Sequence, residues 1–343
     1  MTLPALYRLR EANPKSKFTL LTDQKLADLW ENTDHFDEIL TFKKSDSPCT
    51  IGTRLKKYTY DTALIFPNSF RSALECWYGN IPKRIGYAGN WRSLLLTDPI
   101  GHRAQSVPMR KRVKIDIEYR LINNLDRQTF PSNAHHIHQY LHLAKQLGAG
   151  DEPLAPKLIR RENSSSLESI NVSPPYIGLI AGAKYGPAKR WPAKNFIETA
   201  NAIVKEYQIH VLLLGGRDDC EIAKEIEVGL PSEKVTNLAG KTSLTELTSI
   251  LANCEVVLSN DTGPMHLAAA VETPVVVPFG STSPELTGPG LPHNLASPHH
   301  LIHTDVGCSP CFLRKCPIDL RCFKSITVEN VLAAVENVLA TKN

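Results

Sequence analysis

The sequence lacks a long hydrophobic run, a leader-like start and a marked excess of either charge. It contains no stretch of about 18 apolar residues, so we expect no membrane-spanning helix. Residues 1–10 do not show the charged-then-apolar order of a signal peptide. Lys and Arg exceed Asp and Glu by 39 − 35 = 4, which is too little for a dedicated nucleic-acid binder but suits an acidic substrate. We therefore expect a cytoplasmic protein that binds no nucleic acid.

Several catalytic motifs are also missing. There is no G-x-S-x-G elbow, no Walker loop and no H-E-x-x-H helix, which argues against hydrolases, NTPases and zinc peptidases. Eight cysteines in 343 residues are too few for a disulfide scaffold. The apolar share of 42% and the charged share of 22% are those of a globular protein rather than a disordered one. At roughly 150 residues per domain, the length suggests two domains.

The second half alternates short β-branched runs with helical segments. Ser243 and Glu246 have the spacing of a capping box that opens a helix. Strands and helices that alternate at this rhythm are typical of a parallel sheet. The predicted strands are 176–181, 210–214, 235–238, 255–259 and 274–279, and further helices are predicted at 195–204 and 328–339.

The first half alternates in the same way, less clearly. Its predicted strands are 18–22, 38–42, 62–66, 84–87 and 93–97, and its predicted helices are 113–125 and 136–147. Residues 153–156 and the serine-rich 163–168 have linker composition. We therefore predict an α/β fold with two lobes, residues 1–158 and 170–326, followed by a C-terminal helix at 327–343.

Ligands of open parallel sheets bind where the strands end, because the βα turns gather there. After the first strand of the second lobe comes a turn with small residues and cations: Gly182, Ala183, Lys184, Lys189 and Arg190. Cations beside a helix N-terminus form a phosphate cradle. The alternative is a solvated loop whose lysines have no function.

A second polar turn follows the strand 255–259. Asp261 is suited to accept hydrogen bonds from sugar hydroxyls, and Gly263 offers a backbone N–H to an anion. The alternative is that Asp261 or Thr262 only caps the next helix. His266 either contacts ligand or packs. With Gly215–Gly216 and the run that starts at Gly280, these turns predict a nucleotide-diphosphate site.

Two further groups of residues, four cysteines and three histidines, have structural explanations as well as functional ones. Four cysteines fall within 15 residues, and four thiolates can hold structural zinc; the alternatives are reduced thiols or local disulfides. These are Cys308, Cys311, Cys316 and Cys322. Three histidines, His135, His136 and His138, lack obvious acidic partners, so we expect them on a solvated helix face.

The motifs together resemble the ADP-heptose:lipopolysaccharide heptosyltransferases of glycosyltransferase family 9, and most closely their heptosyltransferase II branch. The resemblance rests on 182–192, 260–266, 278–282, 67–72, 84–87 and the cysteine cluster. It implies a GT-B fold, in which two Rossmann-like lobes face each other across a cleft, and an inverting transferase with no cofactor and no essential metal. The second lobe is then expected to bind the donor ADP-heptose. The first lobe is expected to bind the acceptor, the heptose of heptosyl-Kdo2-lipid A, at the cytoplasmic face of the inner membrane.

The resemblance also assigns roles to individual residues. Lys189 matches the lysine that contacts the donor diphosphate, where a fixed cation stabilises charge on the leaving ADP. Asp261, Thr262, Gly263 and His266 match the nucleotide-sugar turn. In the first lobe, Arg71 is the residue we expect at the acceptor; Arg84, Arg92, Arg110, Lys111 and Arg112 make the same region basic.

The sequence departs from the family at its start. In the family, an aspartate in a Gly-Asp pair just before the first helix acts as general base, and this sequence begins at the position that follows the pair. We therefore expect the first strand and the base to be missing, either because the sequence is a piece of a longer one or because catalysis has been lost. Without the base, donor binding should persist while transfer slows about 10²–10⁴-fold.

Three other functions stay open at this point. The first is a family-9 transferase with another donor sugar or acceptor. The second is a non-catalytic nucleotide-sugar-binding protein. The third is a zinc-stabilised nucleic-acid module, against which the near-neutral charge argues.

Overall fold

The computed structural model describes residues 1–31, 33–158, 172, 174–291 and 297–342. The chain forms two compact units. Unit 1 contains residues 1–106 and 135–154, and unit 2 contains residues 107–134, 155–158 and the described residues from 172 onward. The predicted linker 163–168 lies outside the described residues. None of the described helices is long and apolar enough to cross a membrane.

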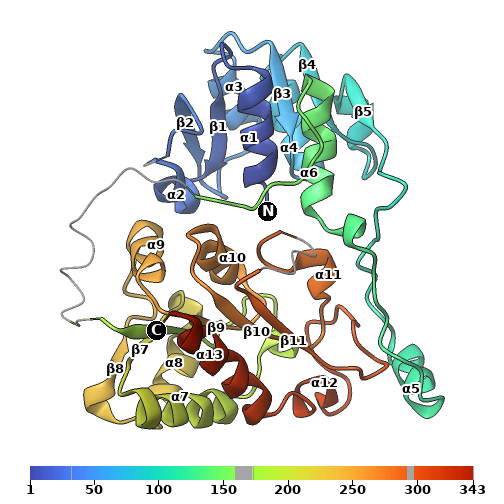
Figure 1. Cartoon of the computed structure of the whole chain (residues 1–343). Coiled ribbons are helices and arrows are strands. Elements are labelled where there is room, and N and C mark those ends of the chain that lie inside the picture. Colours follow the sequence, from blue (N-terminus) through green and yellow to red (C-terminus); the bar gives the residue numbers. More distant parts are fainter. Residues whose placement is uncertain (32, 159–171, 173, 292–296, 343) are drawn as a thin grey trace. The chain divides into compact units, whose positions relative to one another are not determined.

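Unit 1 contains two parallel sheets, one with the order β1-β2 and one with the order β3-β4-β5. One apolar cluster packs α3 and α4 against these strands, and another packs α1 and α6 (Figure 1). The strands are β1 (Thr19–Asp23), β2 (Glu38–Phe42), β3 (Thr62–Ile65), β4 (Lys83–Tyr87) and β5 (Asp98–Ile100). The α-helices are α1 (Leu3–Ala12), α2 (Ala27–Glu31), α3 (Pro48–Leu55), α4 (Phe70–Tyr78) and α6 (Ile137–Ala144).

Four of the five strands predicted for the first half are confirmed, and the strand at 93–97 is wrong. Residues Arg92–Leu95 form a short 3₁₀ helix, and the strand starts only at Asp98. The Arg92 side chain is buried, and its Nη1 donates to the carbonyl of Pro67. This tertiary contact holds the turn and overrides the local β propensity.

Unit 2 is built on six parallel strands in the order β11-β10-β9-β6-β7-β8. Figure 1 shows α7, α8 and α13 on one face of this sheet and α9 and α10 on the other, each face with its own apolar cluster. The strands are β6 (Tyr176–Ile180), β7 (His210–Leu213), β8 (Val235–Asn237), β9 (Val257–Ser259), β10 (Val275–Phe279) and β11 (His300–His303). The α-helices are α5 (Lys114–Ile122), α7 (Ala193–Tyr207), α8 (Cys220–Val228), α9 (Leu244–Ala252), α10 (Gly263–Ala270), α11 (Pro284–Thr287), α12 (Arg321–Lys324) and α13 (Val328–Lys342).

All five strands predicted for the second half are confirmed. Four of them, β6, β7, β9 and β10, are largely buried and read as continuous apolar runs, whereas the edge strand β8 is only partly buried. The capping box of Ser243 and Glu246 is also present at the start of α9. Strand β11 was not predicted, since its sequence HLIH is short and only partly buried. The C-terminal helix α13 belongs to unit 2, where it packs on α7.

The predicted boundary between the lobes is wrong for one segment. Residues 107–134 lie in unit 2, although they precede the last helix of unit 1 in the sequence. Arginine side chains hold the segment there: Arg112 Nε donates to the carbonyl of Pro310 at 2.9 Å, and Arg120 Nε donates to that of Gly307 at 2.6 Å. Contacts between residues almost 200 positions apart leave no local sequence pattern. The segment was therefore assigned to the first lobe by its position in the sequence.

Candidate functional site

The loops expected to form the site do gather at one edge of unit 2, because β10, β9, β6 and β7 are neighbours in a parallel sheet. Asn260, which is fully buried, joins two of these loops. Its Nδ2 donates to the carbonyl of Ala181 at 2.7 Å, and its Oδ1 accepts from the backbone N–H of Trp191 at 2.9 Å. The loop after β6 is thus fixed to the turn after β9. The sequence showed a polar residue at Asn260 but not this role.

Lys189 and Asp261 form the centre of the site. The Nζ of Lys189 lies 2.6 Å from Asp261 Oδ2, and the two side chains are 16% and 6% exposed. Thr282 Oγ1, from the loop after β10, donates to the same carboxylate oxygen at 2.6 Å. The loops that follow β6, β9 and β10 therefore each contribute one side chain to a single cluster. A lysine ammonium has three donors, so Lys189 keeps capacity for a ligand.

The capping alternative for Asp261 is wrong. Its carboxylate is engaged by Lys189 and Thr282, and α10 is preceded by Thr262, whose side chain makes no capping hydrogen bond. The Thr262 side chain therefore leaves the first N–H groups of α10 uncapped, and this end carries the positive pole of the helix dipole. Gly263, the first helical residue, is exposed, and a Cβ placed there would meet no atom within 4 Å. This end of the helix is therefore open to an anion.

The loop after β6 has an exposed lysine and a buried, tightly packed start. Lys184 is exposed, whereas Gly182 and Ala183 are buried. A Cβ on Gly182 would lie 2.0 Å from Asp219 Oδ1, so this position excludes any larger residue. Gly182 thus permits close packing against the loop after β7, and its assignment to donor binding stays a prediction.

Tyr185 adds an aromatic ring to the site, and Arg314, which lies close to this ring, adds a second cation. The Nζ of Lys189 lies 5.2 Å from the centre of this ring, and the guanidinium of Arg314 lies 5.3 Å from it. The Tyr185 hydroxyl donates to the carbonyl of Phe312 at 2.8 Å. The ring is therefore fixed between two cations. Arg314 is exposed, and the sequence pattern gave no reason to place it here, 125 residues after Lys189.

One predicted donor residue, Gly280, has an evident packing contact. A Cβ on Gly280 would come within 2.6 Å of the Phe323 ring, so glycine at this position lets α12 approach the sheet. His266 lies in the first turn of α10 and is partly buried. A ligand role for either residue stays a prediction.

A buried ion pair stands beside the cluster and was not predicted. Arg127 donates from both terminal nitrogens to the two carboxylate oxygens of Glu285, at 2.7 and 2.8 Å. Ser283 Oγ, next to Thr282, donates to Glu285 Oε2 at 2.5 Å. Burial alone would raise the pKa of Glu285, but these hydrogen bonds outweigh it and hold that pKa below its ordinary value. The pair fixes the loop after β10, which carries Thr282.

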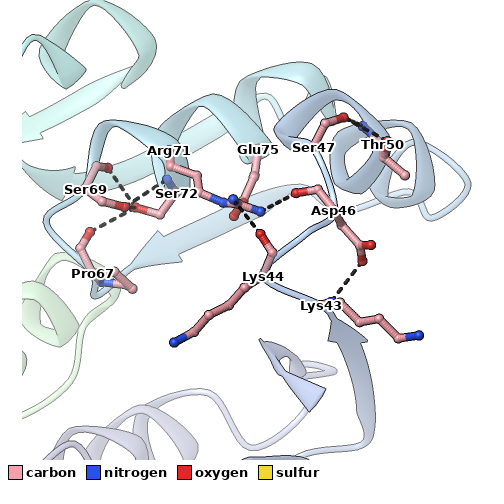
Figure 2. A network of polar contacts seen from close by, with 10 residues as sticks. All are labelled: Lys43, Lys44, Asp46, Ser47, Thr50, Pro67, Ser69, Arg71, Ser72 and Glu75. Atoms are coloured by element: carbon pink, nitrogen blue, oxygen red, sulfur yellow. Dashed lines mark hydrogen bonds and ion pairs between the residues drawn. The ribbon is translucent and has the colours of Figure 1, made fainter. Parts of the chain in front are cut away.

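In unit 1, the guanidinium of Arg71 is engaged by its own surroundings (Figure 2). Its Nε donates to Glu75 Oε1 at 2.8 Å, and its terminal nitrogens donate to the carbonyls of Asp46 and Lys44. These contacts tie the loop after β2 to α4. Acceptor binding by Arg71 stays a prediction, and the arrangement shown explains the residue without it.

The other basic residues of the predicted acceptor region divide into two groups. Arg84, Arg92 and Arg112 direct nitrogens to backbone carbonyls. Arg110 and Lys111 are exposed, and they belong to unit 2 rather than to the first lobe. Three of these five basic residues therefore have a structural role, because their guanidinium groups bind backbone carbonyls.

The prediction that the three histidines lie on a solvated helix face is wrong. His135 is only 2% exposed and lies before α6, and its Nδ1 accepts from the N–H of Ile137.

The prediction of a structural zinc site gains no support. Among the described residues, no three His, Cys, Asp or Glu side chains form a group that could hold a metal ion. Cys308 and Cys311 pack with Ile117, whereas Cys322 packs in the large apolar cluster of unit 2. Burial raises the pKa of Cys308 to about 11 and that of Cys322 to about 12, so both are thiols at neutral pH.

Known proteins resemble this chain in sequence and in structure. The family model "Glycosyltransferase family 9 (heptosyltransferase)" matches residues 49–321. Lipopolysaccharide heptosyltransferase 2 of Salmonella typhimurium is 36% identical over 254 residues, and that of Escherichia coli is 34% identical over 254 residues; each alignment covers 70% of this chain. The matched part spans about 65% of the length of these two relatives.

The solved structure of E. coli ADP-heptose LPS heptosyltransferase II superposes with a TM-score of 0.80 at 26% identity. It covers 99% of this chain and 95% of its own. The α/β fold expected from the resemblance, with parallel sheets in each of two units, is thereby confirmed. The family match extends over most of the chain and includes the Lys189–Asp261 cluster and the cysteine segment up to Arg321. The chain belongs to glycosyltransferase family 9.

Proposed function

We propose that this protein is an inverting glycosyltransferase that moves L-glycero-D-manno-heptose from ADP-heptose to the heptose of the lipopolysaccharide inner core. Family membership and the names of its relatives support the reaction. The observation that carries the proposal is the Lys189–Asp261–Thr282 cluster at the carboxyl ends of three parallel strands. It places a fixed cation beside the open N-terminus of α10, as a leaving diphosphate requires.

The donor half of the mechanism follows from charge. As the bond between the anomeric carbon and the diphosphate oxygen lengthens, negative charge accumulates on ADP. A cation held in place before the reaction stabilises that charge more in the transition state than in the ground state. Lys189 is such a cation, because Asp261 fixes its ammonium at 2.6 Å. The N–H groups at the start of α10 add to it, and no metal ion is needed in this proposal.

The role of Asp261 differs from the one that its sequence position suggests. A carboxylate that is almost fully buried and already accepts two hydrogen bonds is a positioning group for Lys189. We propose that Asp261 orients Lys189. Contact with a sugar hydroxyl is secondary.

The acceptor of this reaction is a glycolipid, heptosyl-Kdo2-lipid A, so the protein must work at a membrane surface. We propose peripheral contact with the cytoplasmic face of the inner membrane. Exposed side chains would make this contact.

A thermal-shift titration with ADP, UDP, GDP and ADP-heptose tests the donor assignment. A ligand that binds only the folded state raises stability by RT ln(1 + [L]/Kd), or about 2.7 kcal/mol at a hundredfold excess over Kd. We expect ADP and ADP-heptose to raise the melting temperature and UDP and GDP to leave it nearly unchanged. Equal shifts with all three nucleoside diphosphates would mean that the site does not select adenine. An absence of any shift would remove the donor assignment.

A further inference from the structure

Helix α5 presents two apolar faces, and packing explains only one of them. Ile117, which is 1% exposed, and Leu121 pack against Cys308 and Cys311 of unit 2. On the opposite side, Ile115, Tyr119 and Ile122 are 78%, 59% and 78% exposed. Their spacing of four and three residues aligns them in one stripe along the helix. Figure 1 shows α5 as an outlying helix of unit 2.

Two further exposed apolar residues stand in the segment that leads to the helix. Met109 is 44% exposed and Val113 is 65% exposed. Single exposed apolar residues are ordinary on a protein surface, but a contiguous patch marks an interaction site. The patch consists of Met109, Val113, Ile115, Tyr119 and Ile122.

Basic residues border this patch. The side chains of Arg110 and Lys111 are exposed and have no ion pair within the described ranges. Lys114 is also exposed, and its partner Glu118 lies 3.6 Å away on the same helix. Over residues 109–123, five Lys and Arg side chains stand against two Asp and Glu. Arg112 and Arg120 are engaged by unit 2, so Arg110 and Lys111 supply the exposed positive charge next to the patch.

We infer that the α5 patch docks the protein on an anionic lipid surface, with Ile115, Tyr119 and Ile122 inserted at the interface and Arg110 and Lys111 against lipid headgroups. An apolar stripe with basic neighbours is the signature of a helix that lies in the membrane interface, and a tyrosine suits that depth. A second copy of this chain is a poor occupant, because two positive patches repel each other. The inference deepens the proposed function, but its test needs no turnover.

A second exposed apolar pair supplies the comparison. Trp91 and Leu94 in unit 1 are each 84% exposed, more than any residue of the α5 patch. The one basic residue between them, Arg92, is buried and bonded to the carbonyl of Pro67. If hydrophobicity alone governed membrane binding, this pair would contribute more than the α5 stripe. Charge complementarity selects α5 instead.

The test is co-sedimentation of the full chain with vesicles of phosphatidylglycerol and phosphatidylcholine in equal parts, and with vesicles of phosphatidylcholine alone. We expect binding to the mixed vesicles that weakens as salt is added. The double variant Ile115→Ser/Ile122→Ser should bind about tenfold more weakly or worse. Arg110→Gln/Lys111→Gln should lose about 10- to 30-fold on mixed vesicles only. The matched control Trp91→Ser/Leu94→Ser should bind like the unmodified chain.

Since every substituted side chain is exposed, the thermal unfolding midpoint and the ADP-induced shift should not change in any variant. The inference is overturned if the unmodified chain ignores the mixed vesicles, or if the α5 variants bind as well as it does. It is also overturned if the Trp91/Leu94 variant loses binding instead, or if the α5 variants only dissociate a dimer seen by light scattering. In each of these cases an intact ADP shift would leave the donor assignment standing.

Discussion

Lys189 and Asp261 form an ion pair with a nitrogen–oxygen distance of 2.6 Å, between the loops that follow the neighbouring strands β6 and β9. The two residues are 72 positions apart. Their pairing turns two loops into one site, since a change in either residue alters the position of the other.

Substitution of Lys189 by Ala should slow transfer about 10²–10³-fold, since loss of one preorganised donor costs about 2.7–4 kcal/mol of transition-state stabilisation. The affinity for ADP should fall less than the rate, because the interaction is stronger in the transition state. Steady-state kinetics with ADP-heptose would measure both effects.

Lys184→Ala separates the two lysines of this loop. The sequence assigned Lys184 to the phosphate cradle as well, but its side chain is exposed and has no ion pair in the part of the chain that the structure describes, so we expect it not to contribute. The kinetics of this variant should match those of the unmodified protein. Equal effects of the two substitutions would mean that only the overall charge of the loop matters.

Substitution of Asp261 by Asn should weaken ADP binding about tenfold, because a hydrogen bond between charged groups contributes about 1.5–3 kcal/mol. Thr282→Val removes a neutral donor to the same oxygen and should have a smaller effect, about 0.5–1.5 kcal/mol. Isothermal calorimetry with ADP would rank the two variants. The exposed Asp218 provides the control Asp218→Asn, and an affinity for ADP that is unchanged in Asp261→Asn would show that Lys189 needs no positioning.

The Arg127–Glu285 pair should make unit 2 sensitive to acid. The pKa of Glu285 is lowered in the folded protein, so its contribution to stability is present above the pKa of the unfolded chain. That contribution is lost as the pH falls through the folded pKa. Arg127→Met leaves the carboxylate buried without its partner and should cost about 3–5 kcal/mol at neutral pH.

Chemical unfolding of unmodified protein and of Glu285→Gln, followed from neutral pH to about pH 3, would separate the two states. The glutamine variant should show a shallower loss of stability in this range. Parallel curves would exclude Glu285 as a source of the acid sensitivity.

Substitution of Arg71 by Ala should destabilise unit 1, because Glu75 is only 4% exposed and loses its ion pair. Burial already raises the pKa of Glu75, against the lowering effect of Arg71. In the variant this pKa should rise further, so the loss of stability, about 1–3 kcal/mol at neutral pH, should shrink as the pH is lowered and Glu75 becomes protonated.

The double variant Arg71→Met/Glu75→Met removes both charges and should recover most of this loss. Melting curves at pH values on both sides of the folded pKa would check the two effects. If Arg71→Ala left stability unchanged at every pH but raised the KM for the acceptor, Arg71 would be a ligand contact instead.

The sequence predicted most of the fold of unit 2 because its strands are buried on both faces. The apolar composition of runs such as Val275–Phe279 is enough to predict that they are buried. It also placed the site loops correctly, since the order of strands and helices forces their ends to one edge. What it missed depends on distant partners: the short helix at Arg92–Leu95, and the contact between Arg127 and Glu285.

The same limit applies at the site. Asp261 looks like a helix cap when only its neighbours in the sequence are considered, and its pairing with Lys189 argues against that role. Its contact with a sugar hydroxyl stays a prediction. Arg71 looks like a free cation until the carbonyls of Lys44 and Asp46 are placed around it. A motif identifies residue types, whereas the partner of each charge depends on the three-dimensional arrangement.

The placement of residues 107–134 in unit 2 has a consequence for anyone who wishes to produce the donor lobe by itself. A gene cut in the region before Val172 would yield a polypeptide without α5 and without Arg127. Glu285 would then be a buried anion with no counter-ion, and the surface that Ile117 covers would be bare. Such a fragment should aggregate, whereas a circularly permuted or co-expressed version that restores residues 107–134 should dissolve.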